Sequence, residues 1–344
     1  MTQRPVIGIT MGDPAGIGPE IIVKALTGGD LHRCCRPMVI GDPGVLAAAI
    51  SALSGDLSLR IVPGPEAVRN DPGVIHVMAL SRLEQEWFRP GTPTVEGGKA
   101  MVRYIIRAVE MCMAGSIAAM VTCPVSKVLM HRAGYRYDGH TPLLAHLTKT
   151  KDHVMMLMGE RLRVVLVTIH RAIREVPGLL TREGVFRVIS VTSAALRQDF
   201  GLEDPSLAVA ALNPHAGEEG LFGTEEETII APAVRQALEA GYRVAGPLPA
   251  DTLFFKAASG RFDAVVCMYH DQGLIPLKLL HFSDGVNVTL GLPIIRTSVD
   301  HGTAYDIAGT GKADAASLRA AVRTAAEMAE NRRRFGNERR TDKG

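Results

Sequence analysis

The sequence contains few cysteines and no long apolar run. Five cysteines occur in 344 residues, their number is odd, and no CxxC pair is present. They are Cys34, Cys35, Cys112, Cys123 and Cys267. This usage argues against a disulfide framework and against a cysteine metal site, and it favours a reducing compartment. Because no run approaches the roughly 20 apolar residues of a membrane helix and no signal peptide opens the chain, we expect a soluble, cytoplasmic protein.

An excess of charge of one sign is also missing. The formal net charge is +2, so the sequence gives no electrostatic case for nucleic acid or an anionic membrane as a partner. Residues 331–344 are locally basic, and we expect a solvated tail that frays. With 47% apolar residues, the chain can bury a sizeable core, as one catalytic unit over 1–344 with two interleaved subdomains.

Short apolar runs alternate with amphipathic segments, which is typical of an α/β protein with a largely parallel sheet. Strands are expected at 6–10, 37–41, 118–122, 163–169, 207–212 and 264–269, and helices at 96–114, 181–200, 225–240 and 315–333. Residues 51–93 are less regular and predict a peripheral strand pair. A further helix is expected after Gly139, with Thr141 as its N-cap and Pro142 at its first position.

A glycine-rich loop, MGDPAGIGPE at 11–20, separates the first strand from the first helix. Its backbone N–H groups could face an anion or a cofactor. The spacing is not GxGxxG, so the loop does not predict a Rossmann fold. A tight turn that requires glycine explains the motif equally well.

Three of the predicted strands run into a histidine, at His170, His215 and His270. The carboxyl ends of parallel strands share one sheet edge, so these imidazoles can converge. Three neutral imidazoles suit zinc, cobalt, nickel or iron and leave positions open for a substrate. The histidines at 32, 76, 131, 146, 153 and 281 lack this placement, and we interpret them as structural or exposed.

The stretch from 267 to 311 carries further candidates. Lys278, Asn287 and Arg296 are donors suited to carboxylate or phosphate oxygens. A glycine-flanked loop, HGTAYDIAG, then occupies 301–309.

Taken together, these motifs resemble the 4-hydroxythreonine-4-phosphate dehydrogenase (PdxA) family over nearly the whole chain. The matching stretches are TMGDPAGIGPEI at 10–21, GHT at 139–141, LNPHAGE at 212–218, GPLPADTLF at 246–254, MYHDQG at 268–273 and GVNVTLGLPIIRTSVDHGTAYDIAG at 285–309. The resemblance implies a divalent metal (zinc, cobalt, nickel, magnesium or manganese) on His170, His215 and His270. It implies substrate contacts from His140, Thr141, Lys278, Asn287 and Arg296. It also implies a homodimer with shared active sites, and our working hypothesis takes His170 and His270 from opposite chains.

A wider similarity links the chain to isopropylmalate and isocitrate dehydrogenases. It implies an isopropylmalate-dehydrogenase-like fold, with two α/β/α subdomains sharing a largely parallel sheet and an active site in the cleft between them. Residues 301–309 are similar to the HGSAPDIAG adenosine loop of that superfamily, with Tyr305 in place of the usual proline. The Asp306-Ile307 pair implies NAD as cofactor. The implied cofactor residues are Gly12, Asp13, Gly16, Gly18, His301, Gly302, Asp306 and Ile307.

The implied reaction is oxidation of the 3-hydroxyl of a phosphorylated four-carbon acid to a 3-oxo acid that decarboxylates. Asp251, Asp271 and Lys278 all remain candidates for the base. Related branches oxidise 4-phosphooxy-L-threonine, 4-phospho-D-threonate or D-erythronate, or an unphosphorylated terephthalate dihydrodiol. Asn287 and Arg296 favour a phosphorylated substrate, whereas residues 139–148 and 275–280 look more like the sugar-acid branch.

Two other classes of function are compatible with parts of the sequence. A three-histidine zinc hydrolase would explain the imidazoles and leave the 301–309 loop unexplained. A non-redox, phosphate-binding transferase would explain the anion-binding donors and leave the histidines unexplained.

Overall fold

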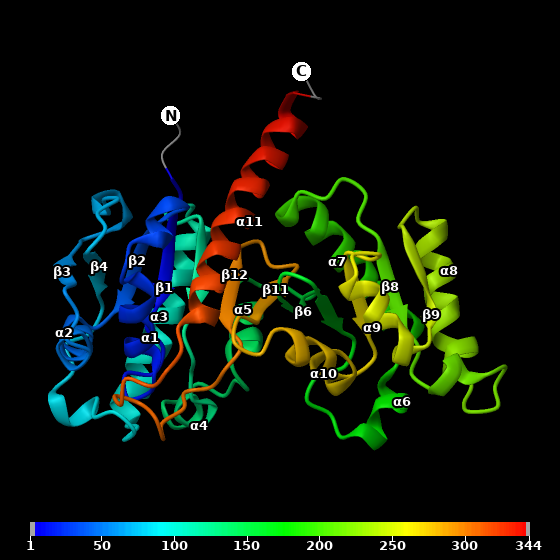
Figure 1. The fold of residues 1–344 in the computed structure, drawn as a ribbon, viewed down its shortest axis with the longest axis horizontal. Coiled ribbons are helices and arrows are strands. Elements are labelled where there is room, and N and C mark those ends of the chain that lie inside the picture. The colour runs from blue at the N-terminus through cyan, green and yellow to red at the C-terminus, as the bar shows by residue number, and fades with distance from the viewer. Residues whose placement is uncertain (1–3, 342–344) are drawn as a thin grey trace. The chain divides into compact units, whose positions relative to one another are not determined.

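The computed structural model describes residues 4–341, with side chains to residue 337. The chain forms two compact units, each assembled from two separate stretches of sequence. Unit 1 comprises residues 1–151 and 292–330, and unit 2 comprises residues 152–291 and 331–344. Figure 1 labels most of their helices and strands.

Unit 1 contains a parallel set of strands in the order β3-β4-β2-β1-β5-β12. These are β1 (Val6–Thr10), β2 (Arg36–Gly41), β3 (Ser58–Ile61), β4 (Val74–Ala79), β5 (Ala119–Thr122) and β12 (Arg296–Val299). Both β1 and β5 are buried along their whole length, as strands covered on two faces must be. The short β3 is largely exposed at the sheet edge, so the predicted peripheral strand pair is confirmed as β3 and β4.

Two helices of unit 1 begin at side chains that accept hydrogen bonds from their first N–H groups. Asp42 accepts from Gly44 and Val45 to cap α2, and Thr94 accepts from Gly97 to cap α3. The helices are α1 (Gly18–Leu26), α2 (Pro43–Ala52), α3 (Val95–Met113), α4 (Lys127–Arg132), α5 (His140–Leu147) and the start of α11 (Ala316–Thr341); short 3-10 turns lie at Asp30–Arg33, Pro65–Ala67 and Gln85–Trp87.

The predicted cap of α5 is wrong. The cap residue is Gly139, with φ 122°, a conformation that favours glycine, and the helix begins at His140. Thr141 therefore lies inside the first turn and Pro142 one position further along.

Unit 2 contains strands in the order β11-β6-β7-β10-β8-β9. They are β6 (Val154–Met158), β7 (Arg163–Leu166), β8 (Leu207–Ala210), β9 (Val244–Leu248), β10 (Ala264–Cys267) and β11 (Val286–Leu290). The pairs β7–β10, β10–β8 and β8–β9 are parallel, whereas β6 is antiparallel to both of its neighbours. Together the two units confirm the α/β class with a largely parallel, mixed sheet.

The core of unit 2 is formed mainly by β7, β8 and β10 packed against α9 and α10, through Val164, Leu166, Val265, Leu253 and Leu277. The helices are α6 (Val176–Leu179), α7 (Arg182–Phe200), α8 (Ala231–Glu239), α9 (Ala250–Ala258) and α10 (His270–Leu280), with 3-10 turns at Ile173–Glu175 and Pro214–Gly217 and a π-helical turn at Glu226–Ile230.

The basic tail, which we expected to fray, continues α11 as helix through Thr341. Nε and Nη2 of Arg332 lie 2.7 and 2.8 Å from the two carboxylate oxygens of Asp199, a two-point contact within unit 2. Over residues 4–341, no helix has the length and apolar character needed to span a bilayer.

Candidate active site

The three strands that lead to the predicted metal ligands are neighbours in unit 2. β10 lies between β7 and β8, and all three run parallel, so their carboxyl ends share one sheet edge. His170 follows β7, His215 follows β8 and His270 begins α10 directly after β10. The predicted placement of the three histidines at one edge is thus what the strand topology provides.

Two of the three imidazoles approach one another within one chain. The ring centroids of His170 and His270 are 5.6 Å apart with a 40° interplanar angle. Our hypothesis that the two ligands of one site come from opposite chains stays a prediction. The His215 ring instead lies 6.2 Å from that of Phe222. Among the residues described, no group of three or more His, Cys, Asp or Glu side chains is arranged to hold a metal ion.

The loop that carries His215 has an unusual backbone. His215, Ala216, Glu218 and Glu219 all have positive φ, at 52°, 56°, 42° and 56°. Such conformations cost energy in non-glycine residues, persist only where surrounding contacts impose them, and cluster at binding loops.

A buried carboxylate holds the start of this loop. Glu226, in the π-helical turn, accepts from the backbone N–H of Leu212 at 2.8 Å and of Asn213 at 2.7 Å. It also accepts from the Asn213 side chain at 2.9 Å. Glu226 is a residue that our reading of the sequence missed, because its partners lie upstream on a loop with no periodic pattern.

His270 has a carboxylate beside it. Its Nδ1 lies 2.7 Å from Oδ1 of Asp271. A carboxylate that accepts from Nδ1–H fixes the imidazole tautomer and leaves Nε2 free to bind a metal. The donor types of His170 and His270, with Asp271 beside His270, therefore fit those that a divalent metal takes in proteins.

One predicted substrate residue of unit 1 is a buried cation. Arg296 on β12 is buried, and its Nε and Nη2 donate to the Thr122 hydroxyl at 3.2 and 2.8 Å. Burial lowers the pKa of Arg296 to about 9, so the guanidinium is charged at neutral pH.

His140 lies on the first turn of α5. Burial, and then the Arg296 charge, holds the pKa of its imidazole well below the usual range, so the ring is neutral at pH 7. The residue is half-buried overall, but its Nε2 is buried without a hydrogen-bond partner. A buried polar atom left unsatisfied in this way favours a ligand that completes it. The half-buried Thr141 follows on the same turn.

The other predicted polar residues lie in unit 2. Lys278, on α10, places its Nζ 5.7 Å from the Phe282 ring centroid, and Asn287 lies on β11. Asp251 is exposed in the first turn of α9.

The glycine loop at 11–20 is buried, and several of its N–H groups form hydrogen bonds within the protein. The N–H of Asp13 donates to Pro124, that of Gly16 to Asp13 and that of Ile17 to Thr303. A Cβ at Gly18 would lie 2.2 Å from the Met11 carbonyl oxygen, and one at Gly12 would lie 2.5 Å from that of Pro124. Close packing thus accounts for the motif, and the structure favours a tight turn over an anion cradle.

Side chains of the 11–20 turn form hydrogen bonds with the 301–313 loop. The Tyr305 hydroxyl donates to Asp13 Oδ2 at 2.6 Å. Glu20 accepts from the N–H groups of Gly309 and Ala313 at 3.2 and 3.0 Å. Burial raises the pKa of Asp13, and the bond from Tyr305 partly offsets that rise. The substitution of tyrosine for the usual proline therefore supplies a tether that the sequence alone did not reveal.

The predicted cofactor residues of this loop are accessible to different degrees. Gly302 and Asp306 are exposed, and Ile307 is half-buried. His301 is half-buried, with Nε2 buried and without a hydrogen-bond partner.

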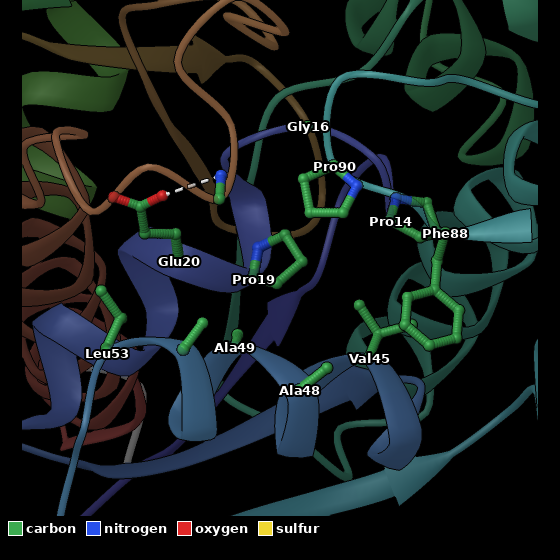
Figure 2. Close-up of a pocket in the computed structure, with 12 residues that line it drawn as sticks. Pro14, Gly16, Pro19, Glu20, Val45, Ala48, Ala49, Leu53, Phe88 and Pro90 are labelled. Carbon is green, nitrogen blue, oxygen red and sulfur yellow. Dashed lines mark hydrogen bonds between the residues drawn. The ribbon is translucent and has the colours of Figure 1, made fainter. Parts of the chain in front are cut away.

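An apolar pocket with a volume of about 110 Å³ lies beside both loops, within unit 1 (Figure 2). Its floor is the face of α2 that carries Val45, Ala48, Ala49 and Leu53, and Gly16 and Gly309 line it from the two loops. Pro14, Pro19, Phe88 and Pro90 form the remaining apolar wall, with the Glu20–Gly309 bond at one side. Small and flat walls of this kind suit a planar ring. The small residues at helical spacing on α2 were a signal that our reading of the sequence did not use.

The comparisons of this chain with known proteins agree on one family. The family model described as pyridoxal phosphate biosynthetic protein PdxA matches residues 33–325. A 4-hydroxythreonine-4-phosphate dehydrogenase of Desulforapulum autotrophicum is 54% identical over 327 residues, covering 95% of this chain and 96% of that protein. A Symbiobacterium thermophilum protein provisionally named D-threonate 4-phosphate dehydrogenase is 44% identical over 329 residues, covering 96% of this chain and 98% of that protein.

A solved structure agrees with the sequence comparisons. The crystal structure of 4-hydroxythreonine-4-phosphate dehydrogenase from Klebsiella pneumoniae matches with a TM-score of 0.88 and 44% identity, over 95% of this chain and 98% of that one. With the model match, the relatives and this structure all in agreement, the chain belongs to the PdxA family of dehydrogenases.

Proposed function

We propose that this chain is an NAD- and divalent-metal-dependent dehydrogenase that oxidises the 3-hydroxyl of a phosphorylated four-carbon hydroxy acid. The observation that carries the proposal is the approach of His170 and His270 at the shared strand edge, with Asp271 beside His270. A metal held there would lower the pKa of the substrate hydroxyl and stabilise the alkoxide. A hydrolytic site needs no loop for the adenosine part of NAD, so residues 301–309 favour oxidation over a zinc hydrolase.

The chain's own residues divide the remaining tasks. Asp271 is engaged with His270 and acts as its orienter, which leaves Asp251 and Lys278 as candidates for the base. Arg296 binds an anionic oxygen of the substrate, and the neutral His140 uses Nε2 in the same contact. Asn287 and Lys278 supply further donors, and Thr141 a hydroxyl.

The substrate is proposed from the relatives' names together with these anion-binding residues. Relatives named 4-hydroxythreonine-4-phosphate dehydrogenase reach 54% and 55% identity, against 44% for the provisional D-threonate 4-phosphate dehydrogenases. This difference favours 4-phosphooxy-L-threonine, a precursor in pyridoxal phosphate synthesis, and runs against our impression of the sugar-acid branch. An unphosphorylated dihydrodiol would leave the buried guanidinium of Arg296 without a phosphate.

NADH formation from a panel of substrates tests the proposal. Purified protein, stripped of metal and then reloaded with Zn²⁺, Co²⁺ or Mg²⁺, is mixed with NAD and 4-phosphooxy-L-threonine, 4-phospho-D-threonate, 4-phospho-D-erythronate or a dihydrodiol. We expect metal-dependent NADH formation, with the highest kcat/KM for 4-phosphooxy-L-threonine. Hydrolysis of phosphate esters without NADH would instead identify a hydrolase.

We assign the preference for NAD over NADP to Asp306. This exposed carboxylate is proposed to accept from the ribose hydroxyls of NAD and to repel a 2′-phosphate. The change Asp306→Lys is therefore expected to shift the NAD/NADP ratio of kcat/KM toward NADP by at least about tenfold, equivalent to about 1.4 kcal/mol. The same charge change at the exposed Asp138 serves as control and should leave the ratio alone. An unchanged ratio in Asp306→Lys would remove the assignment of this loop.

A homodimer is part of the proposal. The outer face of α10 and the turn after it carry exposed apolar side chains: Ile275, Leu279 and Phe282 are 62%, 82% and 81% exposed. An apolar stripe of this kind is typical of a surface that a partner covers. Because His270 begins the same helix, a second chain on this stripe would lie close to the metal ligands, which supports an active site completed by both chains.

A further inference from the structure

The backbone segments that lead to the three histidines are joined to one another by two buried side chains. Gln272, on the first turns of α10, accepts at Oε1 from the N–H of Met268 at 2.7 Å, and its Nε2 donates to the Ala211 carbonyl at 2.6 Å. Thr168 donates from its hydroxyl to the Met268 carbonyl at 2.7 Å. The three segments thus form one hydrogen-bonded chain that runs through the Met268 peptide groups and the Gln272 amide.

These side-chain hydrogen bonds lie just beyond the last backbone pairs of the strands. The β10–β8 ladder ends at the pair Val266–Val209, and the β10–β7 ladder at Cys267–Leu166. Beyond those pairs, Ala211 leads to His215, Met268 to His270 and Thr168 to His170. Backbone bonds from Val167 to Cys267 and from Thr168 to Met268 tie β7 to β10, whereas the Gln272 side chain itself joins the exit of β10 to Ala211 of β8.

We propose that Gln272 is a positioning residue, which sets the exit of β8 against the exit of β10 and so fixes where the His215 loop starts on the sheet edge that carries His170 and His270, whether His215 serves the metal of its own chain or that of a partner chain. This inference rests on the proposed metal-dependent function. Bonds from a metal to its ligands tolerate deviations of only about 0.2 Å, so a shift of one strand exit lowers metal affinity. The carboxamide of Gln272 is suited to the task because it donates and accepts at once, and each of its two partners is a backbone group.

A purely structural role would give a different set of consequences. Gln272 is buried, so removal of its amide leaves the N–H of Met268 and the carbonyl of Ala211 unsatisfied and costs stability in either case. Only a positioning role also changes how the histidines bind a metal. Metal binding by the apoprotein, read independently of turnover, therefore separates the two roles.

The experiment compares Co²⁺ binding to full-length apoprotein, followed by the visible absorption of the bound ion and by competition with a chelator. The change Gln272→Met keeps the length of the side chain and removes both hydrogen bonds. We expect Co²⁺ affinity to fall about tenfold or more, with an altered visible spectrum, as is typical when groups behind metal ligands are removed. The control is Tyr242→Phe, which removes a bond of 2.8 Å to Ser190 elsewhere in unit 2 and should leave affinity and spectrum unchanged.

A second variant reaches the same peptide by another route. Thr168→Val removes the hydroxyl bond to Met268 with little change in shape, so it carries the test if Gln272→Met does not fold. Because both side chains act through Met268, the affinity losses in the double variant should be less than additive. Wild-type affinity and spectrum in both single variants, with only lowered thermal stability, would overturn the positioning role. A wild-type protein that binds no Co²⁺ would overturn the proposed metal function itself, and with it the inference.

Discussion

Replacing either His170 or His270 by alanine is expected to lower kcat/KM by at least about 10³-fold while the protein stays folded. Each change removes one of the two imidazoles that the structure brings to 5.6 Å. A metal that stabilises a developing alkoxide contributes several kcal/mol, and about 4 kcal/mol corresponds to that factor. The measurements are NADH formation at saturating NAD and the metal content of the purified variants, with circular dichroism to verify the fold.

A matched control uses a second pair of rings with similar geometry, one of them a histidine. The rings of His146 and Tyr137 are also 5.6 Å apart, at a 42° angle, on a helix to which we assign no metal. His146→Ala removes an imidazole from that contact and should keep metal and most activity. Near-normal turnover and metal content in His170→Ala or His270→Ala would show that the pair is not a metal site.

Mixing the alanine variants then identifies which chain supplies which ligand. If His170 and His270 serve one site and His215 comes from the partner chain, mixing His170→Ala with His215→Ala gives heterodimers with one intact site. Random exchange makes half of the dimers mixed, so up to about a quarter of wild-type activity should return. Mixing His170→Ala with His270→Ala should return none. Recovery from that second mixture, with subunit exchange verified by native mass spectrometry, would instead place those two ligands on opposite chains.

The change Arg296→Met is expected to lower kcat/KM about 100-fold or more, mostly through KM. The buried guanidinium is a preorganised anion contact, and a charge-assisted hydrogen bond contributes about 1.5–3 kcal/mol. Methionine has a similar length and suits a buried position, so the thermal midpoint should change little compared with the loss of activity. Steady-state kinetics with the phosphorylated substrate and a thermal melt measure the two effects.

Two further variants make the result specific. Arg296→Lys keeps the charge and loses the planar fork, so it should recover only part of the affinity. Arg107→Met removes an exposed guanidinium that bonds to Glu110 at 3.0 Å, and it should leave the kinetics unchanged. A fall in thermal midpoint that matched the activity loss in Arg296→Met would identify a role in the fold and not in substrate binding.

The strand–helix alternation and the histidine edge could be predicted because they depend on local pattern. Apolar runs followed by His170, His215 and His270 imply parallel strands with a common edge, and β7, β10 and β8 are indeed neighbours. Asp271 was already visible in the sequence, as one of three candidates for the base. Its hydrogen bond to His270, which favours a role in orienting the imidazole, depends on side-chain geometry that the sequence does not give.

Other features depend on contacts distant in sequence, so no local pattern could reveal them. The glycine loop at 11–20 has the composition of an anion-binding turn, but its N–H groups bond to segments such as Pro124 and Thr303. The pocket on α2 likewise needs Gly309 from the far end of the chain. Thr141 was assigned as a cap on propensity alone, and the left-handed backbone of Gly139 overrides that preference.

The discontinuous make-up of unit 1 has a consequence for synthesis on the ribosome. The chain begins unit 1, then produces all the strands of unit 2 within 152–291, and only afterwards supplies β12 and α11. Until β12 emerges, the edge of β5 that it pairs with has an open row of N–H and C=O groups, which can pair with other chains. The first unit to be started is thus completed after the strands of the second have been made. Arg296 is the first residue of β12. The strand that pairs with this edge of β5 therefore also brings the guanidinium proposed to bind the substrate into the unit.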